Sequence, residues 1–66
     1  MGYRLKEIRE QAKMTQEELE RRSGISRQTI SAIENNTAKN VLVGTLLALA
    51  KALDTTVDKI FFEQAV

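Results

Sequence analysis

The sequence predicts an all-α protein, a compact bundle of five short helices that forms one domain over residues 1–66. Two observations support this fold class. Apolar residues recur at intervals of three and four in five separate segments, which is the pattern of helices that each bury one face. Residues that start or stop helices stand between these segments, and we expect no β-strand of consequence. A chain this short buries only about 60% of its unfolded surface, so its predicted core is small.

The first helix is predicted between residue 2 or 3 and Lys13. Its apolar stripe consists of Leu5, Ile8 and Ala12. The second helix is predicted over residues 16–23. Thr15 is expected to cap it, because the hydroxyl accepts a hydrogen bond from a free first-turn amide while Glu18 reaches back to the cap. Gly24 is expected to end it, since glycine adopts a positive φ without strain.

The third helix is predicted from Ser26, its expected cap, to Glu34. Its inward residues are Ile30 and Ile33. The outer face has no place in a core and carries Arg27, Gln28, Ser31 and Ala32. Arginine and glutamine side chains bind the edges of guanine and adenine in the major groove of DNA. We therefore predict that these four outer residues contact DNA bases.

The last two helices are predicted over residues 43 or 44 to 53 and over residues 57–63. The first of these is the most apolar and should lie at the centre of the bundle. Neighbouring residues on a helix diverge by about 100°, so Phe61 and Phe62 cannot both face the core. One ring should therefore remain on the surface, where it could cover a partner.

The segment 15–35 resembles the helix-turn-helix of the phage-repressor/Cro-type family, also called the XRE family. The matching positions are Gln16, Leu19, Gly24, Ile25, Ile30, Ile33, Glu34 and Asn35. The resemblance extends from Leu5 and Arg9 in front to the segments LLALAKAL and TTVDKIFF behind. It implies the phage-repressor type of five-helix bundle, with the helix-turn-helix at its second and third helices. It also implies a transcriptional regulator, most simply a repressor. Such a protein binds a palindromic operator as a homodimer, through the major groove of double-stranded DNA.

The resemblance also implies roles for individual residues. In the family, the arginine that matches Arg9 pairs with the glutamate that matches Glu34. Residues at the starts of the second and third helices, and in the loop after the third, contact the DNA backbone. The matching residues here are Thr15, Gln16, Ser26, Thr29, Asn35, Thr37, Lys39 and Asn40. The region of the last two helices often forms a symmetric dimer. The corresponding interface here would consist of Leu42, Val43, Phe61, Phe62 and Val66.

Four positions depart from the family pattern, and one of them is Gly44, where an acidic residue is common. Glu20 stands where a small residue is usual, because the third helix crosses closely there. Its carboxylate needs a partner or an exit to water, and both solutions stay open. Asn36 stands where glycine is usual, and asparagine tolerates the left-handed conformation. Leu42 stands where a capping serine is common, so the start of the fourth helix is poorly defined by the sequence.

Composition narrows the function further. The chain has no histidine and no cysteine, which excludes imidazole and thiol chemistry. It has no glycine-rich phosphate loop and no metal-ligand cluster, so we expect neither an enzyme nor a cofactor. The longest apolar run is too short to span a bilayer, which favours a cytoplasmic, nucleoid-associated protein. A net charge of +1 is low for a nucleic-acid binder. The alternative therefore stays open: an antitoxin-like or co-regulator module whose main partner is another protein.

Overall fold

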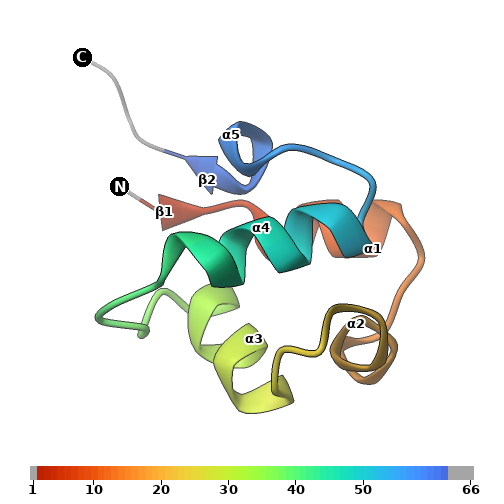
Figure 1. The fold of residues 1–66 in the computed structure, drawn as a ribbon, viewed down its shortest axis with the longest axis horizontal. Helices are drawn as coiled ribbons and strands as arrows, with labels where there is room; N and C mark the ends of the chain where they lie inside the picture. Colours follow the sequence, from red (N-terminus) through yellow and green to blue (C-terminus); the bar gives the residue numbers. More distant parts are fainter. Residues whose placement is uncertain (1, 63–66) are drawn as a thin grey trace.

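The computed structural model describes residues 2–62, with side chains described for residues 3–60. Within this range the chain forms five helices and two short strands (Figure 1). The helices are α1 (Leu5–Gln11), α2 (Gln16–Ser23), α3 (Arg27–Glu34), α4 (Val43–Ala52) and α5 (Val57–Ile60). The strands are β1 (Gly2–Tyr3) and β2 (Phe61–Phe62). The predicted all-α class with a helix-turn-helix at α2 and α3 is confirmed.

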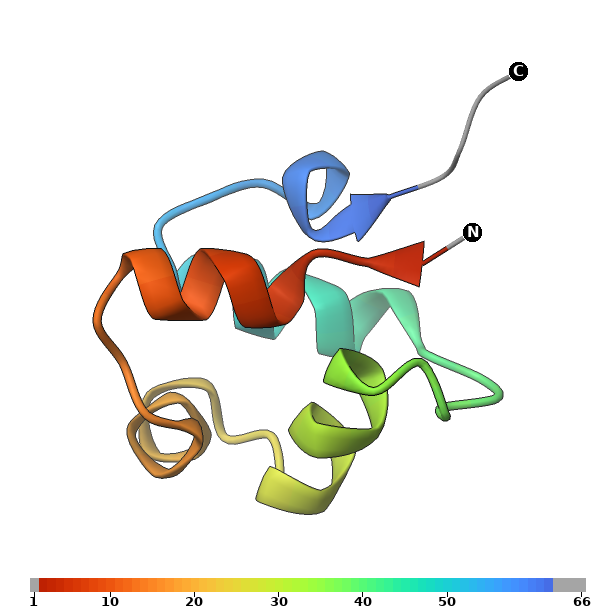
Figure 2. The ribbon, with the colours of Figure 1, turned by 180° about the vertical axis from the view of Figure 1, so that it is seen from behind.

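The core lies where the five helices meet. Helix α4 runs through the middle of the molecule, with α1 against one side, α5 above, and α2 and α3 below (Figures 1 and 2). Every helix contributes a side chain that is 0% exposed, and these residues are Leu5, Leu19, Ile30, Ile33, Leu49 and Ile60. Burial of such aliphatic side chains is the main source of stability in a chain without disulfides.

The ends of the described chain differ from the prediction. Helix α1 begins at Leu5 and ends at Gln11, and α5 ends at Ile60. The residues outside them form a two-stranded antiparallel sheet in which Gly2 faces Phe62 and Tyr3 faces Phe61. The prediction that Phe61 and Phe62 lie on a helix is therefore wrong. Pairing with the opposite end of the chain gives both segments hydrogen-bond partners that a frayed helix end would lack.

The helix starts and stops follow the predicted signals. Thr15 accepts from the amide of Glu18 at 3.1 Å, and Ser26 accepts from the amide of Thr29 at 3.2 Å. Gly24 ends α2 with φ of 76°, and Asn36 follows α3 with φ of 59°. One detail of the capping box is wrong. Among the described contacts the Glu18 carboxylate does not reach back to Thr15, but pairs with Arg22 at 2.8 Å.

Candidate nucleic-acid interface

Helices α2 and α3 are joined by a short turn, residues 24–26, and α3 turns two faces in opposite directions. Ile30 and Ile33 are 0% exposed and fix the inner face against the core. On the outer face Arg27 and Gln28 are exposed, while Ser31 and Ala32 are half-buried. The four residues predicted to contact bases therefore lie on one helix, with the two longest side chains at its N-terminal end.

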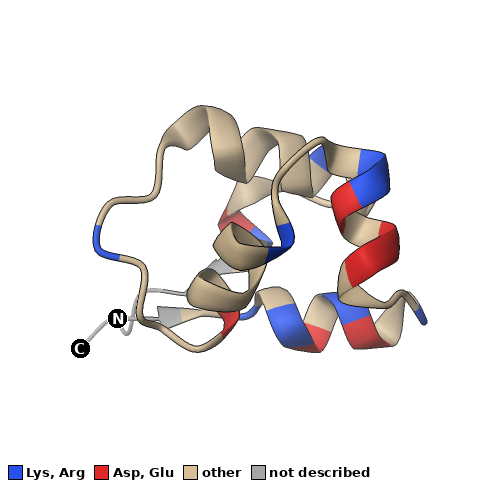
Figure 3. Cartoon of the chain, turned by 90° about the horizontal axis from the view of Figure 1, so that it is seen from below, with Lys and Arg blue, Asp and Glu red and all other residues tan. Residues whose placement is uncertain are grey.

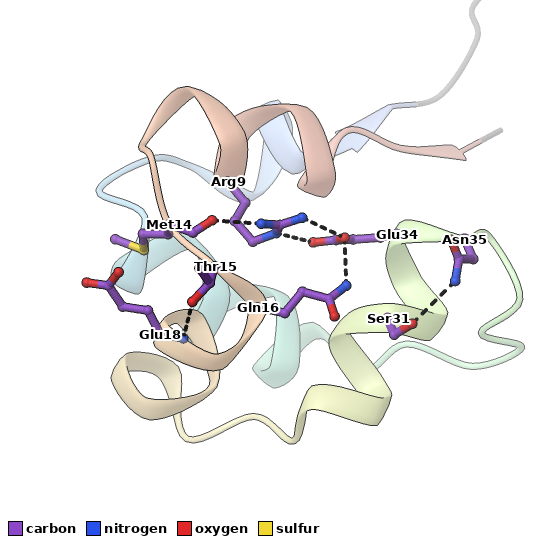
Figure 4. Close-up of polar contacts among 8 residues, drawn as sticks. All are labelled: Arg9, Met14, Thr15, Gln16, Glu18, Ser31, Glu34 and Asn35. Carbon is purple, nitrogen blue, oxygen red and sulfur yellow. Dashed lines mark hydrogen bonds and ion pairs between the residues drawn. The ribbon is translucent and has the colours of Figure 1, made fainter.

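The position of α3 is fixed by a polar cluster beneath its C-terminal end (Figure 4). Arg9 of α1 donates to the two carboxylate oxygens of Glu34, from Nε at 2.7 Å and from Nη2 at 3.2 Å. Its third nitrogen, Nη1, donates to the carbonyl of Met14 at 2.7 Å. The side chains of Arg9 and Glu34 are only 11% and 3% exposed. The hydrogen bonds to Glu34 raise the pKa of the Arg9 guanidinium above its usual range, so this cation stays charged in water at any ordinary pH.

Gln16 belongs to the same cluster, a link that the sequence did not suggest. Its Nε2 donates to Glu34 Oε1 at 2.9 Å, so the first residue of α2 is bonded to the last residue of α3 (Figure 4). Glutamine has two donors on this nitrogen, and one remains for another acceptor. The cluster therefore holds the N-terminus of α2 next to the C-terminus of α3.

The carboxylate of Glu20 has a hydrogen-bond partner, which is one of the two possibilities that the sequence left open. Its Oε2 accepts a hydrogen bond from the backbone amide of Arg27 at 3.0 Å. That amide belongs to the first residue of α3 and has no partner within its own helix. The carboxylate thus crosses from α2 to the positive end of α3, where a negative charge is favoured.

The residues predicted to contact the DNA backbone fall into three groups. Thr15 and Gln16 lie at the start of α2, and Ser26 and Thr29 lie at the start of α3, where the Ser26 hydroxyl donates to Thr29 Oγ1 at 3.0 Å. The remaining four are exposed residues of the segment after α3, and they are Asn35, Thr37, Lys39 and Asn40. Two of these four already have partners within the chain. Asn35 donates to Ser31 Oγ at 3.3 Å, and the Thr37 hydroxyl donates to the carbonyl of Ala32 at 3.3 Å.

A family model described as helix-turn-helix matches residues 5–60, a stretch that contains all five helices. The chain belongs to this helix-turn-helix family. It is of the XRE type, a family of DNA-binding transcription regulators, and the chain shares that general function. The search of the curated proteins found no match.

The charges of this helix-turn-helix protein are unevenly spread (Figure 3). Both acidic and basic residues occur on α1 and on α2. Helix α3 has a single acidic residue, Glu34, which forms an ion pair with Arg9. The segment between α3 and α4 adds one cation, Lys39. In this region Arg27 and Lys39 are the two cations for which no ion pair with a described carboxylate is found.

An apolar patch lies at the start of α4. Leu42 is 72% exposed, Val43 is 68% exposed and Leu47 is 49% exposed. Leu42 and Val43 are among the residues predicted to form a dimer interface, and the structure adds Leu47 to the exposed apolar residues beside them. Leu47 lies next to Val43 on the surface of α4 because it follows that residue by one helical turn. The other predicted interface residues cannot be compared, since Val66 and the side chains of Phe61 and Phe62 lie outside the described part of the chain.

Two further properties concern the described residues alone. Between residues 2 and 62, no group of three or more histidine, cysteine, aspartate or glutamate side chains is arranged to hold a metal ion. In the same stretch, every helix is too short or too polar to cross a membrane.

Proposed function

We propose that this protein is a sequence-specific repressor that binds a palindromic operator as a homodimer, with α3 in the major groove. One observation carries the proposal. Arg27 and Gln28 are exposed at the N-terminal end of a helix whose opposite face is fully buried. Neither side chain bonds to another described residue. The N-terminal residues of the second helix are those that contact base edges in helix-turn-helix proteins.

Contacts to phosphates would hold α3 in its groove. We assign this role to the three backbone-contacting groups described above, which lie at the starts of α2 and α3 and in the segment after α3. The start of α2 suits phosphate because free amides and the positive dipole end of a helix face an anion there. At the start of α3 the amides of Arg27 and Thr29 already have partners, so phosphate contacts there would use side chains. Gln16 is the best placed of these side chains, because Glu34 holds its amide while leaving one donor available.

The homodimer is proposed because one α3 helix contacts too few base pairs to define a unique site in a genome. A helix such as α3, with eight residues, covers only about four or five base pairs, too few to distinguish one site among ~10⁶ competitors. A two-fold dimer doubles both the bases and the phosphates contacted, with its two α3 helices roughly 34 Å apart. The apolar patch of Leu42, Val43 and Leu47 supports this assembly, since a two-fold axis brings the same patch of two copies together.

The same patch also favours the second candidate, a module that binds a different protein. Experiments on the unaltered protein alone, without a partner protein, distinguish the two functions. Selection of bound duplexes from a random pool should yield a palindrome with half-sites one turn apart, and sedimentation should show a dimer. A monomer that selects no sequence would favour the protein-binding module.

A further inference from the structure

Glu20 places a negative charge at the end of α3 that is proposed to enter the major groove. The carboxylate reaches across from α2, and its Oε2 accepts from the amide of Arg27 at 3.0 Å. The side chain is half-buried, so it is held in place without being removed from the surface. The carboxylate therefore lies beside the backbone of a residue that is proposed to contact bases.

A carboxylate in the major groove discriminates between bases. It accepts hydrogen bonds from the amino groups of cytosine and adenine, and it repels the acceptor atoms of guanine and thymine. It also repels phosphate oxygens, and this repulsion grows where the protein displaces water from the DNA. An acidic side chain at this position thus lowers the affinity for most DNA sequences. It lowers the affinity least where the nearby base has an amino group in the major groove.

We propose that Glu20 is a specificity-determining residue, whose carboxylate disfavours DNA that presents acceptor atoms at the start of α3. The inference rests on the proposed function, because it requires α3 to lie in the major groove. Specificity often comes from penalising the wrong partner as well as from contacting the right one. With a net charge of +1 the protein has little general attraction for DNA, and Glu20 lowers it further at one defined contact.

The charge of Glu20 is tested by Glu20→Gln, which keeps an oxygen that can accept from the Arg27 amide. The matched control is Asp58→Asn, which makes the same change in net charge at an exposed position of α5, on the opposite side of the molecule from α3 (Figure 1). Affinity for a random-sequence duplex should rise roughly two- to fivefold per subunit in Glu20→Gln, because a negative charge close to the DNA phosphates is removed. Asp58→Asn should change that affinity less.

The sharper measurement is the base preference of each variant. Unaltered protein should select cytosine or adenine at one position of each half-site, and Glu20→Gln should lose that preference while Asp58→Asn retains it. Glu20→Ala removes the charge and the hydrogen bond together, should lose the same preference, and decides the question if the glutamine variant fails to fold.

Two results would overturn the role of Glu20 alone: an unchanged base preference in the Glu20 variants, or equal gains in random-duplex affinity for Glu20→Gln and Asp58→Asn. If the unaltered protein itself selects no sequence, the proposed function fails, and this inference fails with it.

Discussion

Arg9 donates two hydrogen bonds to the carboxylate of Glu34, although 25 positions separate the two residues in the sequence. The pair joins α1 to the last residue of α3. The contact therefore holds the C-terminal end of α3 against α1. The stability of the core and the direction of the proposed base-contacting face therefore depend on the same contact.

Arg9→Ala should lower the free energy of unfolding by about 3–5 kcal/mol, because it leaves a nearly buried carboxylate without its cation. Arg4→Ala is the matched control. Arg4 pairs with Glu7 at 2.8 Å, but both side chains are half exposed, at 51% and 53%, so the loss should stay below about 1 kcal/mol. Urea denaturation measures both. Equal losses in the two variants would show that the Arg9 pair does not behave as a buried one.

The two described glycines with open space around them offer a second test of stability. At both Gly24 and Gly44 an added Cβ would meet no atom within 4 Å. Gly24 has φ of 76°, so Gly24→Ala should destabilise by about 1–2 kcal/mol through backbone strain. Gly44 is helical, so Gly44→Ala should stabilise by roughly 0.5–1 kcal/mol. Thermal melting should shift in opposite directions, and shifts of the same sign would contradict this backbone explanation.

Much of the helix-turn-helix could be predicted because its signals are local. Helix caps bond to backbone groups only a few residues away, as at Thr15, Gly24 and Ser26. The local sequence is therefore sufficient to place the turn between α2 and α3. The sheet could not be predicted in this way. Gly2 and Tyr3 become a strand only because Phe61 and Phe62 pair with them, and strands of two residues are too short to show alternation.

The polar contacts between helices in the candidate site also depend on residues that are distant in the sequence, and spacing along the chain does not predict them. The resemblance to a known family suggested the Arg9–Glu34 pair, but residue spacing alone does not place two residues so far apart in contact. The bond from Gln16 to Glu34 and the bond from the Arg27 amide to Glu20 also depend on how the helices cross. The sequence showed that Glu20 needs either a partner or an exit to water, and only the packed structure shows that it has a partner, the Arg27 amide.

Arg27→Ala should reduce affinity for the selected operator by about 1–3 kcal/mol and relax the preference at one base position. The reason is the loss of a side chain proposed to bind a base edge. Lys59→Ala also removes a cation, but from α5, and should leave the preference unchanged. Competition binding with selected and random duplexes measures the effect. If Arg27→Ala weakens both duplexes equally, this residue contacts phosphate and not a base.

Lys39→Ala should weaken binding to every sequence alike. A lysine in the segment after α3 is proposed to neutralise one phosphate, so the slope of log affinity against log salt should flatten by about one unit per subunit. Gln28→Ala serves as the comparison, because it removes a proposed base contact without removing charge. Titrations at several salt concentrations decide the role, and an unchanged slope would remove Lys39 from the interface.

Val43→Glu should give a folded monomer with much weaker operator binding. Val43 is 68% exposed and is the first residue of α4, where a carboxylate favours the helix, so the fold should persist. Gln11→Glu introduces the same charge on α1 and should remain dimeric. Sedimentation at high concentration measures the assembly. A dimer that survives Val43→Glu would place the two-fold contact elsewhere.

The small sheet also bears on the order in which the molecule assembles. It joins Gly2 to Phe62 and Tyr3 to Phe61, at opposite ends of the described chain, whereas α2 and α3 are neighbours in sequence. Closing a long loop costs more chain entropy than closing a short one, so the sheet should pair after the helices have packed. A ladder of two residues per strand is also among the weakest units in the molecule and should be the first to open. Partial unfolding should then begin at this sheet, while α2 and α3 remain folded.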